Sequence, residues 1–278
     1  MDTMAAMGPE LLTLALPVLA AGVVAGFLAG LLGIGGGIII VPALLVALAA
    51  TDTAGAVTMH VAVATSLATI VPTSLSSSRA HWRRGSVDVE LARRWAPAVF
   101  LGACAGVLIA DRLHSDTLTA IFAVMAVIFG VKMWLPLDDV VLRDGVPGGG
   151  TALSLPFSIG ALSTLMGIGG GTFGVTALSL FNQPIHRAVG TAALLGFVIS
   201  LPASVGYVLA GWNEPGRPPF SLGYVNLLAV ALIIPATILM APLGAAAAHR
   251  LSRRWLSRLF GVFLVITGIR LAMEVWPS

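Results

Sequence analysis

The sequence predicts an all-α polytopic membrane protein made of two inverted repeats, each a re-entrant, glycine-tipped helical hairpin followed by three transmembrane helices. Three observations predict this fold class: long apolar stretches almost free of charge, a pair of motifs that occurs twice, and an arginine distribution that reverses between the two copies. Together they imply that the chain crosses a membrane several times and that its two halves are oppositely oriented.

The composition is that of a membrane protein. Of the 278 residues, 58% are hydrophobic and only 10% are charged, with a mean hydropathy of +0.99, whereas soluble domains carry about 25% charged residues. In lipid only helices and closed barrels satisfy their own backbone hydrogen bonds. The short alternating segments of a barrel are absent from the sequence, so the spanning segments are expected to be helices.

Charge and cysteine content exclude several function classes. The formal charge of +3 and the pI near 9.7 fit basic loops that hold membrane helices in place, so no nucleic-acid partner is expected. A single cysteine, Cys104, excludes an internal disulfide and a metal–thiolate cluster. No cofactor or metal is therefore expected. The first residues, MDTMAAMGPELL, contain no Lys or Arg and do not resemble a cleaved signal peptide.

Two motifs occur twice. The pentapeptide G-I-G-G-G stands at 33–37 and again at 167–171, and H-x-A-V-x-T begins at His60 and again at His186. Further on, Gly106–Val124 aligns with Gly244–Val262 at a fixed offset and without a gap. We therefore expect two homologous units. The first repeat is assigned to 1–136, a cytoplasmic linker to 137–150, and the second repeat to 151–278.

The arginines indicate that the two units are inverted. The loop after the first H-x-A-V-x-T helix holds five arginines, whereas its equivalent, 212–222, holds one. The next pair of loops reverses this pattern, with one arginine in 111–116 and four in 249–258. Because positively charged loops face the cytoplasm, corresponding loops are expected on opposite sides of the membrane.

Inversion requires each repeat to cross the membrane an odd number of times. Three ordinary helices per repeat satisfy this condition, so each glycine segment must enter and leave on the same side. The arms after the glycines, 38–50 and 172–182, would span roughly 20 and 16 Å against a ~30 Å hydrocarbon core. With both termini outside, twelve of the fifteen basic residues lie on the cytoplasmic side. The ordinary helices are expected near 60–80, 95–111, 117–136, 186–211, 223–248 and 257–276.

The glycines are expected to form the tips of the two hairpins near the middle of the bilayer. Non-helical backbone is tolerated there only when it is buried in protein or lines a wet cavity, and inverted-repeat transporters bind substrates at such breaks. A helix begins after each tip, at Ile38 and Thr172, and its free N–H groups favour an anion. Glycine would permit positive φ and close approach to a ligand. The alternative is that these glycines serve helix packing, whereas Gly22 is expected on a plain helix surface.

The acidic residues also favour an anionic substrate. All twelve Asp and Glu fall in tails, loops or helix ends, so an intramembrane acid for a cation or proton relay is not evident. Mid-span polar groups are hydroxyls, which donate hydrogen bonds to oxyanions. His60 and His186 are candidates for coupling, or alternatively interface residues where two helices start. The expected substrate-binding residues are Gly33, Gly35, Gly36, Gly37, Thr65, Ser66, Gly167, Gly169, Gly170, Gly171, Thr172 and Thr191.

These motifs resemble the TauE/SafE sulfite exporter family, also called the toluene sulfonate uptake permeases. The resemblance is carried by GLLGIGGGIIIVPALL (30–45), HVAVATSLATIVPTSLSSSRAHWRRGSVD (60–88), GIGGGTFGVTAL (167–178) and HRAVGTAALLG (186–196). It implies a transporter of sulfite, thiosulfate or organosulfonates in the bacterial inner membrane. One departure is Ala64, where the family more often has glycine before the threonine; the second copy keeps Gly190.

Two other function classes stay open at this point. A passive anion channel could use the same glycine tips, and concentrative transport under a proton gradient would distinguish a transporter from it. An intramembrane enzyme would need a nucleophile–base pair, an acid pair or metal ligands at depth, which the sequence does not supply. The substrate, the direction, the coupling ion and the oligomeric state are left open, a homodimer included.

Overall fold

The computed structural model describes residues 15–28, 36–49, 55–135, 143–145, 151–248 and 253–276. This part of the chain is almost entirely helical, so the all-α prediction is confirmed. The exception is a short antiparallel hairpin that pairs β1 (Ser221–Leu222) with β2 (Val225–Asn226). The helices are Ala15–Leu28, α2 (Gly37–Ala49), α3 (Thr58–Arg83), α4 (Val89–Arg112), α5 (Ser115–Trp134), α6 (Thr151–Leu165), α7 (Gly171–Leu180), α8 (Ile185–Ala210), α9 (Leu227–Ala248) and α10 (Arg253–Val275).

Helix lengths fall into two classes. Within the described ranges, four helices (α3, α4, α5 and α8) are long and apolar enough to cross a membrane by length and composition. The helices that follow the glycine motifs are shorter: α2 has 13 residues and α7 has 10. These lengths correspond to about 20 and 15 Å, well below the ~30 Å hydrocarbon core.

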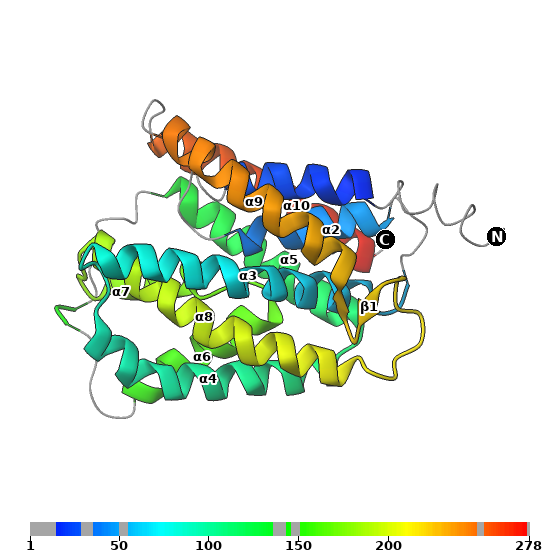
Figure 1. The fold of residues 1–278 in the computed structure, drawn as a ribbon, viewed down its shortest axis with the longest axis horizontal. Coiled ribbons are helices and arrows are strands. Elements are labelled where there is room, and N and C mark those ends of the chain that lie inside the picture. Colours follow the sequence, from blue (N-terminus) through cyan, green and yellow to red (C-terminus); the bar gives the residue numbers. More distant parts are fainter. Residues whose placement is uncertain are drawn as a thin grey trace.

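Helices α3 and α8 form the centre of the molecule. They pack on each other and run antiparallel through the middle of Figure 1, and the short helices α2 and α7 lie against α3 and α8 respectively. Helix α4 packs on α6 and α8, while α5 packs on α10. The core is apolar, with Trp95, Tyr207 and Phe122 fully buried. Large apolar side chains such as Leu108 and Leu209 are exposed on the outer surfaces, as expected for helices that face lipid.

Glycine allows the closest helix contacts. A β-carbon added at Gly130 of α5 would lie 2.7 Å from the Gly261 carbonyl oxygen of α10, and one at Gly261 would lie 2.7 Å from the Gly130 carbonyl oxygen. The expectation that Gly22 lies on a plain surface is wrong. A β-carbon there would come within 3.1 Å of the Ile233 Cα on α9. Gly22 therefore also belongs to a small-residue helix contact.

The α5–α10 contact gives the first prediction. Gly130→Val or Gly261→Val should separate the two helices and lower the thermal unfolding midpoint of the detergent-purified protein, since overpacking costs typically about 1–3 kcal/mol. Gly55→Ala is the control, because a β-carbon there would meet only the Gly216 carbonyl oxygen, at 3.8 Å. Midpoints of both valine variants equal to that of Gly55→Ala would contradict the packing role.

Candidate functional site

The two glycine motifs meet in the structure although they belong to different halves of the sequence. A β-carbon added at Gly37 would lie 2.7 Å from the Gly167 carbonyl oxygen and 3.0 Å from the Ile168 Cα. Ser66 of α3 lies at the same place, because its hydroxyl donates to the Gly167 carbonyl at 2.8 Å. The Gly37 carbonyl oxygen is 3.5 Å from the same hydroxyl. The described tip residues therefore form one contact region.

The central helices enclose this region. Ile70 of α3 touches both tips, since β-carbons at Gly37 and Gly169 would lie 2.8 and 2.6 Å from its side chain. On the other side, a β-carbon at Gly170 would lie 3.2 Å from the backbone nitrogen of Gly196 on α8. Within the described tips, only Gly167 has positive φ (+66°), while Gly170 has φ −49°. The expectation of left-handed backbone thus holds at Gly167, whereas Gly37, Gly169 and Gly170 are required for space.

A helix N-terminus lies at each tip. Helix α2 starts at Gly37 and α7 at Gly171. The Gly36 carbonyl accepts from Ile39 at 3.0 Å and from Ile40 at 2.9 Å, and the Gly170 carbonyl accepts from Gly174 at 2.8 Å. The N–H groups at the very start of each helix, those of Gly37 and Ile38 in α2 and of Gly171 and Thr172 in α7, come before these first helical hydrogen bonds and point toward the tip. Residues 11–51 and 151–182 contain no Asp, Glu, Lys or Arg. The two segments that carry the tips therefore contribute positive helix ends and neutral donors but no formal charge.

Within the described residues, four buried hydroxyls of the second half have no hydrogen-bond partner: Ser163 and Thr164 of α6, Thr172 of α7 and Ser200 of α8. Thr172 is 6% exposed and Ser200 is fully buried, and neither side-chain oxygen is paired. Side chains in a helix tilt toward its N-terminus, which directs Thr172, in the first turn of α7, toward the tip. Ser200 follows Gly196 by one turn of α8 and shares its face. An unpaired buried hydroxyl costs roughly 1–3 kcal/mol, so both groups fit donors that await a ligand.

Comparison with known proteins identifies the family. The family model described as Sulfite exporter TauE/SafE matches residues 18–271. The chain belongs to the TauE/SafE family. A probable membrane transporter protein of Haemophilus influenzae is 34% identical over 255 residues, which cover 91% of this chain and 96% of that protein. The probable membrane transporter protein YunE of Bacillus subtilis is 26% identical over 272 residues, with 91% and 95% coverage. No solved structure matches the chain.

Membership in the TauE/SafE family makes the chain a membrane transporter and not an enzyme. The structure brings most of its expected site residues together. Gly33 and Gly35 lie outside the described residues. The residues gathered at the tips or in the first turns of the helices that follow are Gly36, Gly37, Ser66, Gly167, Gly169, Gly170, Gly171 and Thr172.

The two motif threonines have other partners. The Thr65 hydroxyl accepts the backbone N–H of Asn226 at 3.0 Å, and the Thr191 hydroxyl accepts the backbone N–H of Asp88, also at 3.0 Å. Both threonines are fully buried. Each therefore holds the residue that precedes α9 or α4, a role that the repeat motif did not reveal.

The two histidines are placed differently from each other. His60 is buried, its Nε2 lies 2.9 Å from the Ala110 carbonyl oxygen, and its ring stacks on Tyr224 with centroids 5.1 Å apart. Burial raises the pKa of the Tyr224 phenol to about 12, so this neighbour remains neutral. His186 is exposed at the start of α8. Among the described residues, neither ring hydrogen-bonds to a tip residue or stacks on one.

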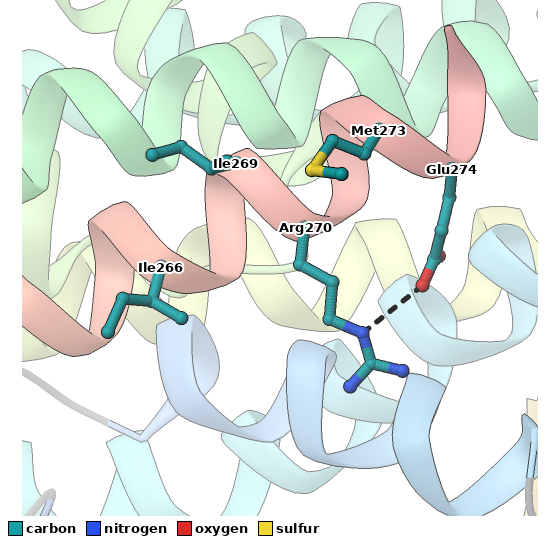
Figure 2. Close-up of a pocket in the computed structure, with 5 residues that line it drawn as sticks. All are labelled: Ile266, Ile269, Arg270, Met273 and Glu274. Atoms are coloured by element: carbon teal, nitrogen blue, oxygen red, sulfur yellow. Dashed lines mark ion pairs between the residues drawn. The ribbon is translucent and has the colours of Figure 1, made fainter. Parts of the chain in front are cut away.

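One cation escaped the sequence reasoning. Lys132 of α5 donates from Nζ to the Thr176 hydroxyl at 2.7 Å, and Thr176 lies one turn beyond Thr172 on the same face of α7. Its counterpart in the second repeat, Arg270, pairs with Glu274 at 3.3 Å. Figure 2 shows this pair pointing toward each other beside a surface pocket, whose lining among the described residues comes from α10 and includes Ile266, Ile269 and Met273. That pocket shares no residue with the tips.

The unpaired hydroxyl of Thr172 gives the second prediction. Thr172→Val keeps the side-chain volume and removes the unsatisfied group, so the ligand-free protein should unfold at a higher temperature, by the equivalent of about 1 kcal/mol. Thr237→Val is a matched control, because this equally buried threonine of α9 donates to the Ile234 carbonyl at 2.9 Å. The Thr237→Val substitution should lower the thermal unfolding midpoint or leave it unchanged. A lower midpoint for Thr172→Val than for Thr237→Val would show that Thr172 has a stabilising partner.

Proposed function

We propose that this TauE/SafE protein transports small sulfur-containing oxyanions, such as sulfite, thiosulfate or organosulfonates, and binds them where the two glycine tips meet. The observation that carries the proposal is the convergence of two helix N-termini on one uncharged region with the unpaired hydroxyls of Thr172 and Ser200. Backbone N–H groups and hydroxyls donate without contributing formal charge. Such donors suit an anion that accepts several hydrogen bonds.

The energy balance supports a site without arginine. A hydrogen bond to a charged group contributes roughly 1.5–3 kcal/mol, so three or four of them can offset much of the dehydration of a small anion. The family description names sulfite, which fits this donor set.

Internal contacts support the inverted repeat that the mechanism requires. The β-carbon built on Gly130 lies 2.7 Å from the Gly261 carbonyl oxygen, and that built on Gly268 lies 2.8 Å from the Ala123 carbonyl oxygen. The offset that aligns Gly106 with Gly244 also converts Gly130 into Gly268 and Ala123 into Gly261. One contact is therefore the image of the other under exchange of the halves, as expected for a two-fold relation between 1–136 and 151–278 across the linker 137–150.

The short helices support re-entrant hairpins. Helix α6 leads into the second tip and α7, about 15 Å long, leads out of it. The first tip has the same order, from the helix Ala15–Leu28 to α2. We place both termini outside the cytoplasm and the arginine-rich turn between α3 and α4 inside it. In this arrangement the two hairpins enter from opposite sides and meet near the midplane.

The third prediction tests the binding site. Purified protein should gain thermal stability with one or more of sulfite, thiosulfate, sulfoacetate, taurine and sulfate at constant ionic strength. Thr172→Val should weaken binding of that anion about tenfold, the equivalent of one charge-assisted hydrogen bond. Thr237→Val should bind as the wild type does. Equal affinities for wild type and Thr172→Val would remove the hydroxyl from the site and leave the glycines as packing residues.

The fourth prediction tests the topology. Single cysteines at Asp52 and Asn213 should react with a membrane-impermeant reagent from outside, and those at Ser86 and Ser252 only from the cytoplasm. The expected sides follow from the reversed arginine loops. Reaction of the Ser86 and Ser252 positions from opposite faces would contradict the inverted arrangement.

A further inference from the structure

The bonds that Thr65 and Thr191 accept form a pair, which we call the threonine clamps. In the first clamp the Thr65 hydroxyl of α3 accepts the Asn226 N–H, and in the second the Thr191 hydroxyl of α8 accepts the Asp88 N–H, both at 3.0 Å. Asn226 and Asp88 also cap the helices that follow them. The Asn226 Oδ1 accepts from Ala229 at 2.8 Å, and the Asp88 Oδ1 accepts from Leu91 at 3.0 Å.

The clamps are equivalent under the internal repeat. The two threonines occupy the same position of the H-x-A-V-x-T motif. Asp88 and Asn226 are related by the offset that aligns Gly106 with Gly244, and the residues that they cap, Leu91 and Ala229, are related by the same offset. Four hydrogen bonds thus follow one relation between the halves, which makes a coincidental contact a poor explanation.

Each clamp joins the two halves at one end of the molecule. Thr65 belongs to the first half and holds the start of α9 in the second, whereas Thr191 belongs to the second half and holds the start of α4 in the first. Figure 1 shows α4 beginning at the left-hand end of α8 and the β1–β2 hairpin, which leads into α9, at the right-hand end. The clamps therefore lie at opposite ends of the α3–α8 pair.

Each clamp is also one residue from a glycine tip. Ser66, which follows Thr65, donates to the Gly167 carbonyl. Ala192, which follows Thr191, has its carbonyl oxygen 3.4 Å from the β-carbon position of Gly170. A clamp that opens displaces a residue in direct contact with the tip region, because adjacent Cα atoms are held about 3.8 Å apart across a trans peptide.

Gly190 permits the close approach of two backbones at the second clamp. A β-carbon at Gly190 would overlap the Ser86 carbonyl group, so glycine is what lets the turn before α4 reach Thr191. The equivalent residue in the first clamp is Ala64, which is fully buried.

We propose that the threonine clamps are the two gates of the transport cycle, one on each side of the membrane, and that Asp88 and Asn226 are the residues that position them. Both clamps are closed in this structure. Opening one gives access to the tips from one side while the other keeps the halves joined. The proposal rests on the proposed function for its purpose, but the clamps themselves are independent of which anion is carried.

The gates differ in strength. The Asn226 amide also donates to the Pro219 carbonyl at 3.0 Å and lies 3.4 Å from the Ser221 hydroxyl, which ties this clamp to the β1–β2 hairpin. A carboxylate at Asp88 offers acceptors alone. The Asp88 gate is therefore the easier one to open, and in the proposed topology it faces the cytoplasm.

The test measures access to Ser200, which is fully buried one turn of α8 beyond Gly196, whose β-carbon position lies 3.4 Å from the Gly170 nitrogen. Ser200→Cys in a Cys104→Ala background is reconstituted in vesicles of known orientation and treated with an impermeant thiol reagent from either side, without substrate. Thr65→Val should raise the labelling rate from the Asn226 side, and Thr191→Val from the Asp88 side, each about five- to tenfold, the population shift expected for one lost hydrogen bond. Thr65→Ser and Thr191→Ser keep the hydroxyl and should label as the parent does.

Asn226→Ala and Asp88→Ala give a second route to the same result if a valine variant does not fold, because they loosen the caps and leave the threonines in place. Increases on the same face for both clamps, or no change in any folded variant, would overturn the proposal. So would loss of anion binding in the valine variants with unchanged labelling, since the threonines would then be ligands. Sided labelling without any anion transport would refute the proposed function and leave the gates standing.

Discussion

The structure depends on one constraint: in a membrane every backbone N–H and C=O needs a partner, and the two glycine tips interrupt the helices that supply them. The interruption is tolerated because α3 and α8 cover the tips from both sides. The Ser66 hydroxyl satisfies the Gly167 carbonyl, and Ile70 fills the space between Gly37 and Gly169. Groups that remain without a partner in the helical ladder, the first N–H groups of α2 and α7, are those that an anion can satisfy.

This constraint explains why glycine recurs away from the tips. Two halves that enclose a common centre must approach closely along their flanks, and the backbones of α5 and α10 meet at Gly130 and Gly261. Side chains there would force the halves apart and expose the tips. Packing glycines and tip glycines thus serve the same end, although only Gly167 among the described tip residues uses the conformational freedom of glycine.

The sequence predicted the helical fold and the meeting of the two glycine motifs, because apolar length and repeated motifs are properties of the chain itself. It did not predict the roles of Thr65 and Thr191. A repeated threonine signals a repeated constraint, but its partners, Asn226 and Asp88, lie far away in the sequence, each in the opposite half. The offset between the repeats already relates Asp88 to Asn226. The two capping residues could therefore have been found as an equivalent pair from the sequence, but their hydrogen bonds to Thr191 and Thr65 could not. Lys132 escaped because a basic residue near a helix end is read as a loop anchor.

The two halves differ in the hydroxyl groups that they place near the tips. We therefore expect them to play different roles in binding. Ser66 and Ala192 occupy equivalent positions after the motif threonines, yet only Ser66 has a hydroxyl, and that hydroxyl is already bonded to Gly167. The unpaired hydroxyls of Thr172 and Ser200 both belong to the second half. In the proposed site, the second half therefore supplies the hydroxyls that donate to the anion. The first half, through Ser66, holds the second tip in the conformation that binds it. Gradients across the membrane set the net direction of transport. In the proposed mechanism, the unequal donors and the unequal Asp88 and Asn226 gates instead determine from which side the anion is bound and released faster.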